Sequence, residues 1–341
     1  MSTASLPPTG PPPPSTPRKI IYIGSRASKL ALIQTNIVRD ALVAAHPELN
    51  FEIISMTTAG DNNQTKPLHQ FGAKALWTEE LEVLLLDYRL DMIVHSLKDM
   101  PTKLPTGCKI GAILEREDPR DALVMKAGSP HKSLDDLPAG SVVGTSSVRR
   151  SSQIAKQYPE LKFADVRGNV LTRLSKLDAP DSPYACLILA SAGLLRLNLE
   201  DRITAPITSP TLLHAVGQGA LGVEIRDTDP SATALLAPLC HVRTTLSCTA
   251  ERSLLRTLEG GCSVPIGVET EFVEGLENVI RMRATVLSLD GRTSVLVEEE
   301  MSISGEEDAD EFGRVVAQAL IEKGAREILD VINLNRSIVD A

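Results

Sequence analysis

The sequence of 341 residues predicts an α/β protein in which two α/β domains precede a smaller α+β domain. Three observations lead to this prediction. Strand-like and helical stretches alternate in two successive runs, over 19–115 and 116–215. A strand-like stretch within 216–238 follows the second run, and we expect it to return to the first domain. From 239 to 341 the pattern changes to strands around an Asp-Gly pair and closing helices, typical of a helix-covered antiparallel sheet.

The first run has the order strand, helix, strand, helix, strand, which indicates a largely parallel sheet. Its strands are expected at 19–24, 51–58 and 91–96, and its helices at 28–46 and 78–89. Either Ser25 or Ser28 can cap the first helix. The polar stretch 59–73 reads as a long surface loop, and loops of that length are commonly functional lids or disordered segments.

The later elements follow by the same reasoning. In the second run, strands are expected at 121–126, 141–147, 161–166 and 185–193, and helices at 148–158 and 169–177. The third part is expected to hold an amphipathic helix at 241–259, strands near 264–270, 279–288 and 293–303, and two closing helices. Residues 1–18 are rich in Pro, Ser and Thr and read as a disordered tail.

Composition argues against several classes of protein. The net charge of −9 is opposite to the basic footprint of a nucleic-acid-binding protein. Apolar runs are a few residues long, far short of the roughly 20 residues of a membrane helix, so no membrane partner is expected. Five cysteines without a CxxC pair, behind an N-terminus that fits no secretory signal, indicate a cytoplasmic protein with free thiols. We expect a monomer.

Arginine is frequent for an acidic chain, with 22 arginines against 13 lysines. A guanidinium group binds carboxylates and phosphates bidentately, so an acidic small ligand fits this composition. The alternative is that many of these arginines are solvated surface residues.

The stretch GTSSVRR is the most informative of five polar stretches that follow predicted strands. Thr145, Ser146 and Ser147 stand where a strand gives way to a helix, whose N-terminal amides attract anions. Arg149 and Arg150 add cations to the first helical turn, where they do not favour the helix. Because a broken local rule often marks function, we interpret this stretch as an anion site. The alternative is a capping segment followed by exposed arginines.

The other stretches contribute further cations, one hydroxyl group and one acid. These residues are Arg26, Ser28, Lys98, Asp99, Arg167, Arg173 and Arg196. Two α/β lobes suggest a ligand cleft between them, and these cations would surround it with positive charge. Lys98 and Asp99 follow a strand end and precede Pro101, which can turn both side chains into that cleft. A partly desolvated carboxylate there can exchange protons or stabilise a cationic intermediate. An ordinary surface Lys/Asp pair is the alternative.

Cys262 lies in LEGGCSVPIG, behind two glycines and ahead of Pro265, so its sulfur sits on a tight, shaped turn. A buried, inert cysteine is the usual alternative, but the room beside this sulfur favours an attached group. No neighbouring histidine motif supports a protease-like dyad, and His95, His214 and His241 show no metal-ligand spacing.

Seven motifs occur in the order found in the porphobilinogen deaminase family: GSRASKLALIQ, HSLKDMP, GTSSVRR, VRGNVLTRL, LASAGLLRL, VGQGALGVE and GGCSVPIG. The chain resembles this family strongly over about residues 19–270 and more loosely beyond. The resemblance implies two α/β domains similar to periplasmic binding proteins with a central cleft, and a third domain that carries the cysteine. It also implies hydroxymethylbilane synthase activity, in which four porphobilinogen molecules are joined head to tail with loss of ammonia and water releases the linear tetrapyrrole.

The resemblance also implies roles for single residues. Cys262 would carry a dipyrromethane cofactor through a thioether, and Asp99 would be the catalytic aspartate that stabilises the cation left when ammonia departs. The carboxylates of the cofactor would be held by Ser96, Lys98, Thr145, Ser147, Arg149 and Arg150. The incoming or second ring would be bound by Arg26, Ser28, Arg167, Arg173 and Arg196, assisted by Gln34 and Gln218. The loop 59–73, followed by Lys74, matches a mobile lid, and no metal is implied.

Two rival functions stay open from the residues alone. A non-catalytic anion-binding module would need the arginines but neither Cys262 nor Asp99, and a thiol-dependent hydrolase would need a histidine close to Cys262. Only the deaminase interpretation expects an intact mass above that of the sequence by two pyrrole units.

Overall fold

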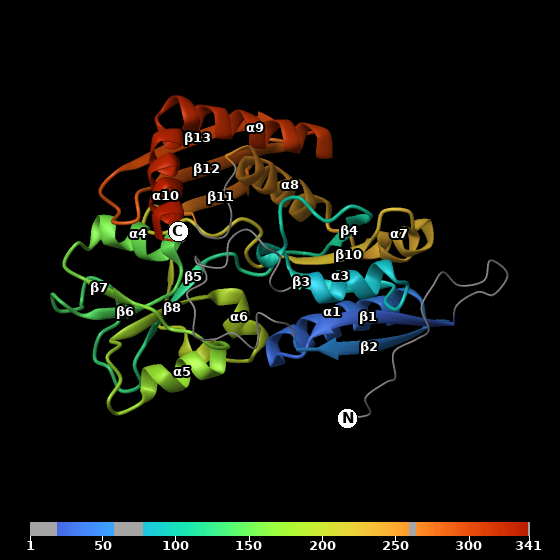
Figure 1. The fold of residues 1–341 in the computed structure, drawn as a ribbon, viewed down its shortest axis with the longest axis horizontal. Coiled ribbons are helices and arrows are strands. Elements are labelled where there is room, and N and C mark those ends of the chain that lie inside the picture. Colours follow the sequence, from blue (N-terminus) through green and yellow to red (C-terminus); the bar gives the residue numbers. More distant parts are fainter. Residues whose placement is uncertain (1–18, 58–77, 259–263, 340–341) are drawn as a thin grey trace. The chain divides into compact units, whose positions relative to one another are not determined.

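The computed structural model describes residues 19–57, 78–258 and 264–339. These residues form two compact units, 19–57 with 78–117 and 220–245, and 118–219 with 246–258 and 264–339. They contain two five-stranded sheets and one three-stranded sheet (Figure 1). The expected tail 1–18, the loop 59–73, Lys74 and Cys262 lie outside the described residues.

The first unit holds a sheet with the strand order β2-β1-β3-β10-β4. Its strands are β1 (Ile20–Arg26), β2 (Asn50–Met56), β3 (Met92–Ser96), β4 (Cys108–Ile113) and β10 (Leu221–Arg226). Its helices are α1 (Lys29–Ala45), α3 (Glu79–Leu86) and α7 (Pro230–Leu236), with the 3-10 turns η2 (Leu97–Asp99) and η4 (Ala237–Leu239). β1, β2 and β3 are parallel, whereas β10 is antiparallel to both β3 and β4. The expected return of β10 to the first sheet is therefore confirmed.

Helices α1 and α3 cover opposite faces of this sheet. Val38 of α1 belongs to the same core cluster as Val94, whereas Leu81 of α3 belongs to a second cluster with Ile93. Because successive side chains of a strand point to opposite faces and both faces are covered, β3 begins with three buried apolar residues, Met92 to Val94, before the polar His95 and Ser96. Of the two expected capping residues, Ser28 begins α1, and its Oγ accepts a hydrogen bond from a backbone N–H three residues on at 3.3 Å.

The second unit holds a five-stranded sheet with the order β7-β6-β8-β5-β9. Its strands are β5 (Asp121–Met125), β6 (Val142–Gly144), β7 (Lys162–Ala164), β8 (Cys186–Ala190) and β9 (Ala205–Ile207). Its helices are α4 (Val148–Gln157), α5 (Val170–Asp178), α6 (Ser191–Arg196) and the 3-10 turn η3 (Glu200–Arg202). β6 is parallel to β7 and β8, and β5 is antiparallel to β8 and β9. Both five-stranded sheets thus have their antiparallel strand in the fourth position.

The C-terminal part is an antiparallel sheet in the order β11-β12-β13, covered by helices. Its elements are α8 (Val242–Thr257), β11 (Ile266–Phe272), β12 (Val279–Leu287), β13 (Ser294–Ser302), α9 (Glu306–Glu322) and α10 (Ala325–Val339). Its core gathers Leu254 of α8, Val268 of β11 and the fully buried Phe312 of α9. The expected hairpin is confirmed, since β12 and β13 pair from Leu287 with Ser294 outward.

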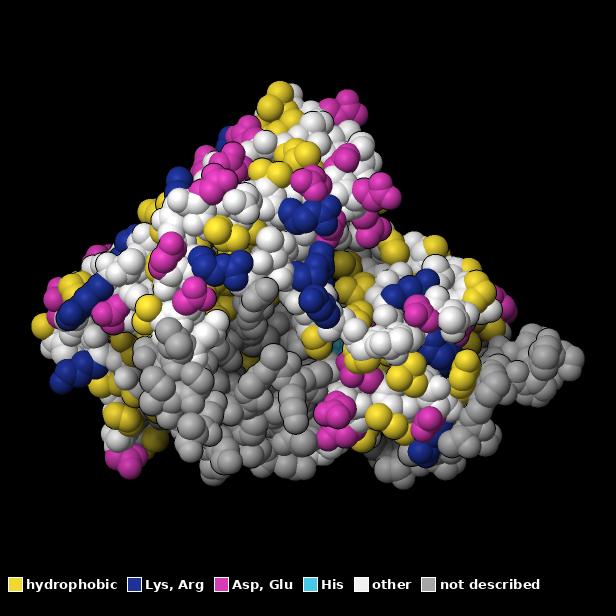
Figure 2. All heavy atoms as spheres, turned by 45° about the horizontal axis from the view of Figure 1, so that its top comes forward, with side chains coloured by type: hydrophobic (Ala, Val, Ile, Leu, Met, Phe, Trp, Pro, Cys, Tyr) yellow, Lys and Arg dark blue, Asp and Glu magenta, His cyan; other side chains and the backbone are white. Residues whose placement is uncertain are grey.

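Charged side chains on the C-terminal sheet alternate in sign across strands. Arg283 of β12 pairs with Glu269 of β11 at 2.7 Å, and Arg281 pairs with Glu271 at 3.0 Å. On the face drawn in Figure 2, acidic and basic side chains are likewise interspersed. Among the residues that the structure describes, no helix is both long and apolar enough to cross a bilayer.

Some elements differ from those expected. β4, β9 and α7 were not expected, and the strand expected over 185–193 ends at Ala190, where α6 begins. β4 contains Gly111, where a Cβ would lie 2.7 Å from side-chain atoms of both Ile225 and Leu236. β9 has three residues and includes Pro206. Glycine and proline weaken a strand signal in the sequence, although here β4 needs its glycine for close packing.

Candidate active site

In the first unit, the residues expected to act on the ligand follow the end of β3. The chain turns at Ser96 into η2, so Lys98 and Asp99 lie on a short helical turn and are half-buried. Leu97 anchors this turn, because its side chain is buried and its N–H donates to the carbonyl of Ala220 at 3.0 Å. The position of Asp99 is thus set by β3 and β10 together.

The same strand end is bound to helix α1. The amide of Gln34, which is buried, hydrogen-bonds with the hydroxyl of Ser96, at 2.9 Å from Nε2 and 3.1 Å from Oε1. Arg26 ends the neighbouring parallel strand β1 and is half-buried, and Ser28 caps α1 two residues later. Arg26 and Ser96 therefore come from the carboxyl ends of two parallel, adjacent strands, the edge where open α/β sheets bind ligands.

A buried acidic cluster lies on the opposite face of β3, under α3. His95 Nε2 is 3.0 Å from Glu224 Oε2, and the side chains are 4% and 0% exposed. Burial, with a smaller contribution from Glu224, raises the pKa of the neighbouring Glu82 above its usual range. Burial and the charges of Glu224 and Glu82 raise the pKa of the Cys108 thiol to about 12. This cluster could not be predicted from the sequence, because its members come from four separate elements, α3, β3, β4 and β10.

In the second unit, the hydroxyl residues of GTSSVRR hold the turn from β6 to α4. Thr145 Oγ1 accepts a hydrogen bond from the N–H of Ser147 at 3.1 Å. Ser146 Oγ bonds both the N–H and the carbonyl of Val166, each at 3.1 Å, which ties this turn to the residue before Arg167. Ser147 is the N-cap of α4, yet its side chain makes no capping hydrogen bond.

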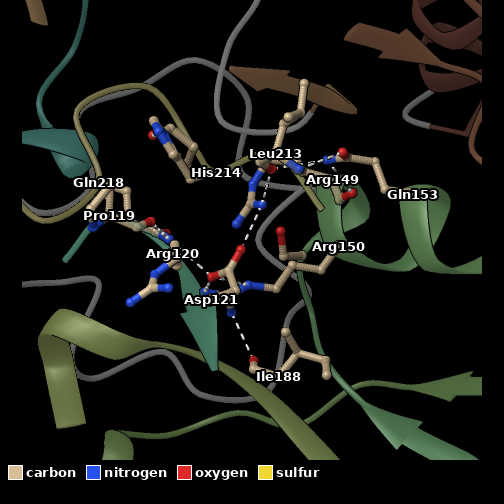
Figure 3. Close-up of polar contacts among 12 residues, drawn as sticks. Pro119, Arg120, Asp121, Arg149, Arg150, Gln153, Ile188, Leu213, His214 and Gln218 are labelled. Carbon is tan, nitrogen blue, oxygen red and sulfur yellow. Dashed lines mark hydrogen bonds and ion pairs between the residues drawn. The ribbon is translucent and has the colours of Figure 1, made fainter. Parts of the chain in front are cut away.

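Arg149 and Arg150 are nearly buried, at 5% and 7% exposed, so the alternative of exposed arginines is wrong. Both bind Asp121, as Figure 3 shows: Arg149 Nη1 lies 2.8 Å from Oδ2, and Arg150 Nη2 lies 2.7 Å from Oδ1. Burial alone would raise the pKa of Asp121, but the two guanidinium groups hold it well below its usual range. The cations at the start of α4 thus have a partner in the protein, which the sequence analysis missed.

The charges of this cluster do not balance. Asp121 supplies one negative charge against the two positive charges of Arg149 and Arg150, and burial lowers the pKa of Arg149 despite Asp121. Gln218, also buried, adds a neutral donor: its Nε2 lies 3.0 Å from Asp121 Oδ1 and 2.6 Å from the carbonyl of Pro119. A buried excess of positive charge beside a helix N-terminus favours an anionic ligand. The donor set therefore fits a cofactor that carries carboxylates.

Three further arginines surround the carboxyl ends of the strands of this sheet. Arg173 Nε donates to the carbonyl of Gly168 at 2.8 Å, and Arg196 Nη2 donates to that of Gly219 at 2.7 Å. Burial lowers the pKa of Arg167, and its buried Nη1 finds no hydrogen-bond partner in the described part of the chain. A buried guanidinium nitrogen without an acceptor is unfavourable unless a ligand accepts a hydrogen bond from it.

Comparison with known proteins decides the family. Residues 21–234 match the family model described as "Porphobilinogen deaminase, dipyromethane cofactor binding domain", and residues 245–322 match "Porphobilinogen deaminase, C-terminal domain". The chain belongs to the porphobilinogen deaminase family. Its relatives include the porphobilinogen deaminases of Yarrowia lipolytica, 54% identical over 92% of this chain and 94% of that protein, and of Saccharomyces cerevisiae, 51% identical over 93% and 98%.

Membership of the porphobilinogen deaminase family confirms the resemblance that the seven motifs indicated, and with it a transferase with a dipyrromethane-binding domain. It does not favour the non-catalytic anion-binding module. The expected α/β class is confirmed by the two five-stranded sheets and the small C-terminal sheet. Among solved structures, a mutant of full-length BenM aligns over 66% of this chain and 67% of its own at 17% identity, with a TM-score of 0.40, too low to carry an argument.

Proposed function

We propose that this chain is a hydroxymethylbilane synthase, which joins four porphobilinogen molecules with loss of ammonia and releases a linear tetrapyrrole. The observation that carries this proposal is the buried pair Arg149 and Arg150, which share the single carboxylate of Asp121. Porphobilinogen carries an acetate and a propionate on its single pyrrole ring, so every ring that is added brings two carboxylates. The membership of the porphobilinogen deaminase family supports the same reaction.

The dipyrromethane cofactor, held on Cys262, would supply an anchored pyrrole to which new rings are joined. Its carboxylates would be bound by Arg149 and Arg150, because the cluster with Asp121 has positive charge in excess. Further donors would come from Ser96, Lys98, Thr145 and Ser147. The hydroxyl of Ser147 supports this role, since a serine at an N-cap ordinarily bonds the helix, and this one makes no such bond.

Asp99 is proposed as the catalytic residue. Loss of ammonia leaves a conjugated pyrrole with positive charge, and a fixed carboxylate stabilises that charge as it develops. The anchored turn η2 supports this assignment, because a buried Leu97 and a backbone hydrogen bond to Ala220 limit the movement of Asp99. A preorganised carboxylate needs no rearrangement at the moment of reaction.

The incoming ring would be bound by Arg26, Ser28, Arg167, Arg173 and Arg196. The buried Nη1 of Arg167 supports its place in this set, since a ligand carboxylate would satisfy it. Gln34 and Gln218 would assist through their neighbours, because Gln34 bonds Ser96 and Gln218 bonds Asp121.

Other features stay predictions of the sequence. We propose a division into 19–115 with 216–238, 116–215 and 239–341, a lid that includes Lys74, a monomer, and a cytoplasmic enzyme without nucleic-acid or membrane partners. The free thiols of Cys108 and Cys186 support a reducing compartment. Light scattering of the purified protein would test the monomer.

Intact-mass measurement tests the proposed function. The purified protein should exceed its sequence mass by two pyrrole units, and incubation with porphobilinogen should release ammonia and a linear tetrapyrrole. A Cys262→Ser variant should keep its fold, because the sequence predicts a turn that depends on its glycines and Pro265 and not on the sulfur, but it should lack both the added mass and the activity. A wild-type protein with no added mass and no ammonia release would overturn the proposal.

A further inference from the structure

We propose that Asp121 is a positioning residue that assembles Arg149 and Arg150 into a ready-made site for the carboxylates of the cofactor. This inference rests on the proposed function. Asp121 is the first residue of β5 and is 1% exposed, and Figure 3 shows it at the centre of the cluster. Its sequence motif and its exposure do not indicate a role in the reaction, but its contacts do.

The carboxylate of Asp121 is shared among side chains from separate parts of the chain. Oδ2 accepts from Arg149 Nη1 at 2.8 Å, and Oδ1 accepts from Arg150 Nη2 at 2.7 Å and Nε at 3.0 Å. Gln218, from the segment after the second sheet, adds a third donor to Oδ1 at 3.0 Å. The two contacts from Arg150 converge on the same oxygen, so two nitrogens of its guanidinium group are held at one acceptor.

Each arginine is also held at a backbone carbonyl. Arg149 Nη1 donates to the carbonyl of Leu213 at 2.7 Å, and Arg150 Nη1 donates to that of Ile188 at 2.9 Å. A guanidinium that is held at two points has little rotational freedom left. A ligand that binds it therefore loses less conformational entropy than one that must first order an exposed arginine.

The charges explain why a carboxylate is needed for this arrangement. Two neighbouring guanidinium groups repel each other, and burial of each is unfavourable without a counter-ion. Asp121 offsets one of the two positive charges and leaves the other for a ligand. It therefore keeps both arginines buried and aligned before any cofactor is present, without neutralising the cluster.

Cofactor acquisition by the apoprotein tests this role. Apoprotein from cells that make no porphobilinogen is mixed with porphobilinogen, and intact mass follows the gain of two pyrrole units over time. Asp121→Asn keeps the shape and one acceptor but removes the charge, so the half-saturating porphobilinogen concentration for this gain should rise about tenfold or more. Asp118→Asn is the matched control, because Asp118 pairs with the exposed Arg120 at 2.7 Å in the same loop, and it should behave as wild type.

A double variant separates positioning from net charge. Asp121→Asn with Arg149→Gln restores the net charge of the wild-type cluster and removes the buried repulsion, so it also provides a folded protein if the single variant fails to fold. If Asp121 is a positioning residue, the double variant should acquire the cofactor at least as slowly as we expect for the single variant, because only one aligned arginine remains. Normal acquisition by folded Asp121→Asn, or recovery of normal acquisition in the double variant, would overturn the positioning role. Failure of the proposed function would instead appear in the wild type, which would gain no mass at all.

Discussion

The two five-stranded sheets share one strand pattern, and each buries a carboxylate on its antiparallel fourth strand: Glu224 on β10 and Asp121 on β5. Their partners differ. Glu224 lies beside His95 and near a second buried carboxylate, Glu82, whereas Asp121 lies between two guanidinium groups. One sheet therefore buries an excess of acid and the other an excess of base.

This difference shows that the strand pattern provides positions and the side chains decide the chemistry. In the second unit, the excess of base lies at the start of α4, where a ligand carboxylate would be bound. In the first unit, the acidic cluster lies beneath the strand that leads to Asp99, and the catalytic group that we propose there is itself an acid.

Among variants that keep the cofactor, replacement of Asp99 should have the largest effect on turnover. Asp99→Asn keeps the size of the side chain but removes its charge, so kcat should fall by about 10²–10³-fold, a magnitude typical for loss of one preorganised electrostatic group. Asp99→Glu should be slow but measurable, and both variants should keep a preformed cofactor by intact mass. Asp40→Asn, an exposed carboxylate on α1, serves as the control. Near-normal turnover in Asp99→Asn would contradict the catalytic role.

Loss of a buried arginine should be the next largest effect, and it should act on stability and cofactor together. Arg150→Gln leaves Asp121 with a weaker set of partners and should lower the free energy of unfolding of the apoprotein by about 3 kcal/mol. Arg202→Gln is the matched control in the same unit, since Arg202 pairs with Asp178 at 2.9 Å but both side chains are partly exposed. Its loss should cost about 1 kcal/mol or less.

Urea unfolding of the apoproteins and the intact mass of the proteins as purified measure these two effects. Arg150→Gln should be mostly free of cofactor, and Arg202→Gln should be fully loaded. Equal losses of stability, with full cofactor in both variants, would show that the buried cluster does not differ from a surface ion pair.

The two buried clusters should respond to pH with opposite sign. The pKa of Glu82 is raised mainly by burial, so the folded state holds its proton more tightly than the unfolded state. That contribution is complete below the ordinary pKa of about 4.3 and is lost as the pH rises through the raised value. The lowered pKa of Asp121 acts the other way, and its contribution is lost as the pH falls below the ordinary value of about 3.9.

Unfolding free energies across pH of wild type, Glu82→Gln and Asp121→Asn would measure this contrast. Glu82→Gln should become more stable relative to wild type as the pH rises, and Asp121→Asn should become less stable. The charged groups that face Glu82 are Glu79 on its own helix, Glu224 and His95. A parallel pH response of the two variants would contradict the opposite charge balance of the clusters.

The smallest effect should come from the two N-cap serines. Ser28 Oγ accepts a hydrogen bond from the backbone of α1 at 3.3 Å, whereas Ser147 makes no capping bond in α4. Ser28→Ala should therefore lower the free energy of unfolding by about 0.5–1 kcal/mol, and Ser147→Ala by less. Ser147→Ala should instead lower cofactor occupancy, read by intact mass. A larger stability loss in Ser147→Ala than in Ser28→Ala would contradict the assignment of helix capping to Ser28 and of cofactor binding to Ser147.

The local features and the family could be predicted from the sequence alone. Alternating strand and helix patterns predicted the α/β class, and the motifs located Ser96, Asp99, Arg149 and Arg150 at strand ends. These features depend on residues within one turn of helix or one strand, so local periodicity and turn chemistry are enough to find them. The short β9 and the glycine-containing β4 were missed because their local signal is weak.

Which charges meet depends, in contrast, on how the whole chain folds. Asp121 and Arg149 are 28 residues apart, and His95 and Glu224 are 129 apart, so no spacing rule connects them. The carboxylate of each pair is placed by an antiparallel strand that enters its sheet beside a parallel one, and strand order is a property of the whole chain. Burial then makes each pair important for stability, since an ion without its partner is unfavourable inside a protein. That is why the cations at the start of α4 appeared unpaired in the sequence and have a buried carboxylate in the fold.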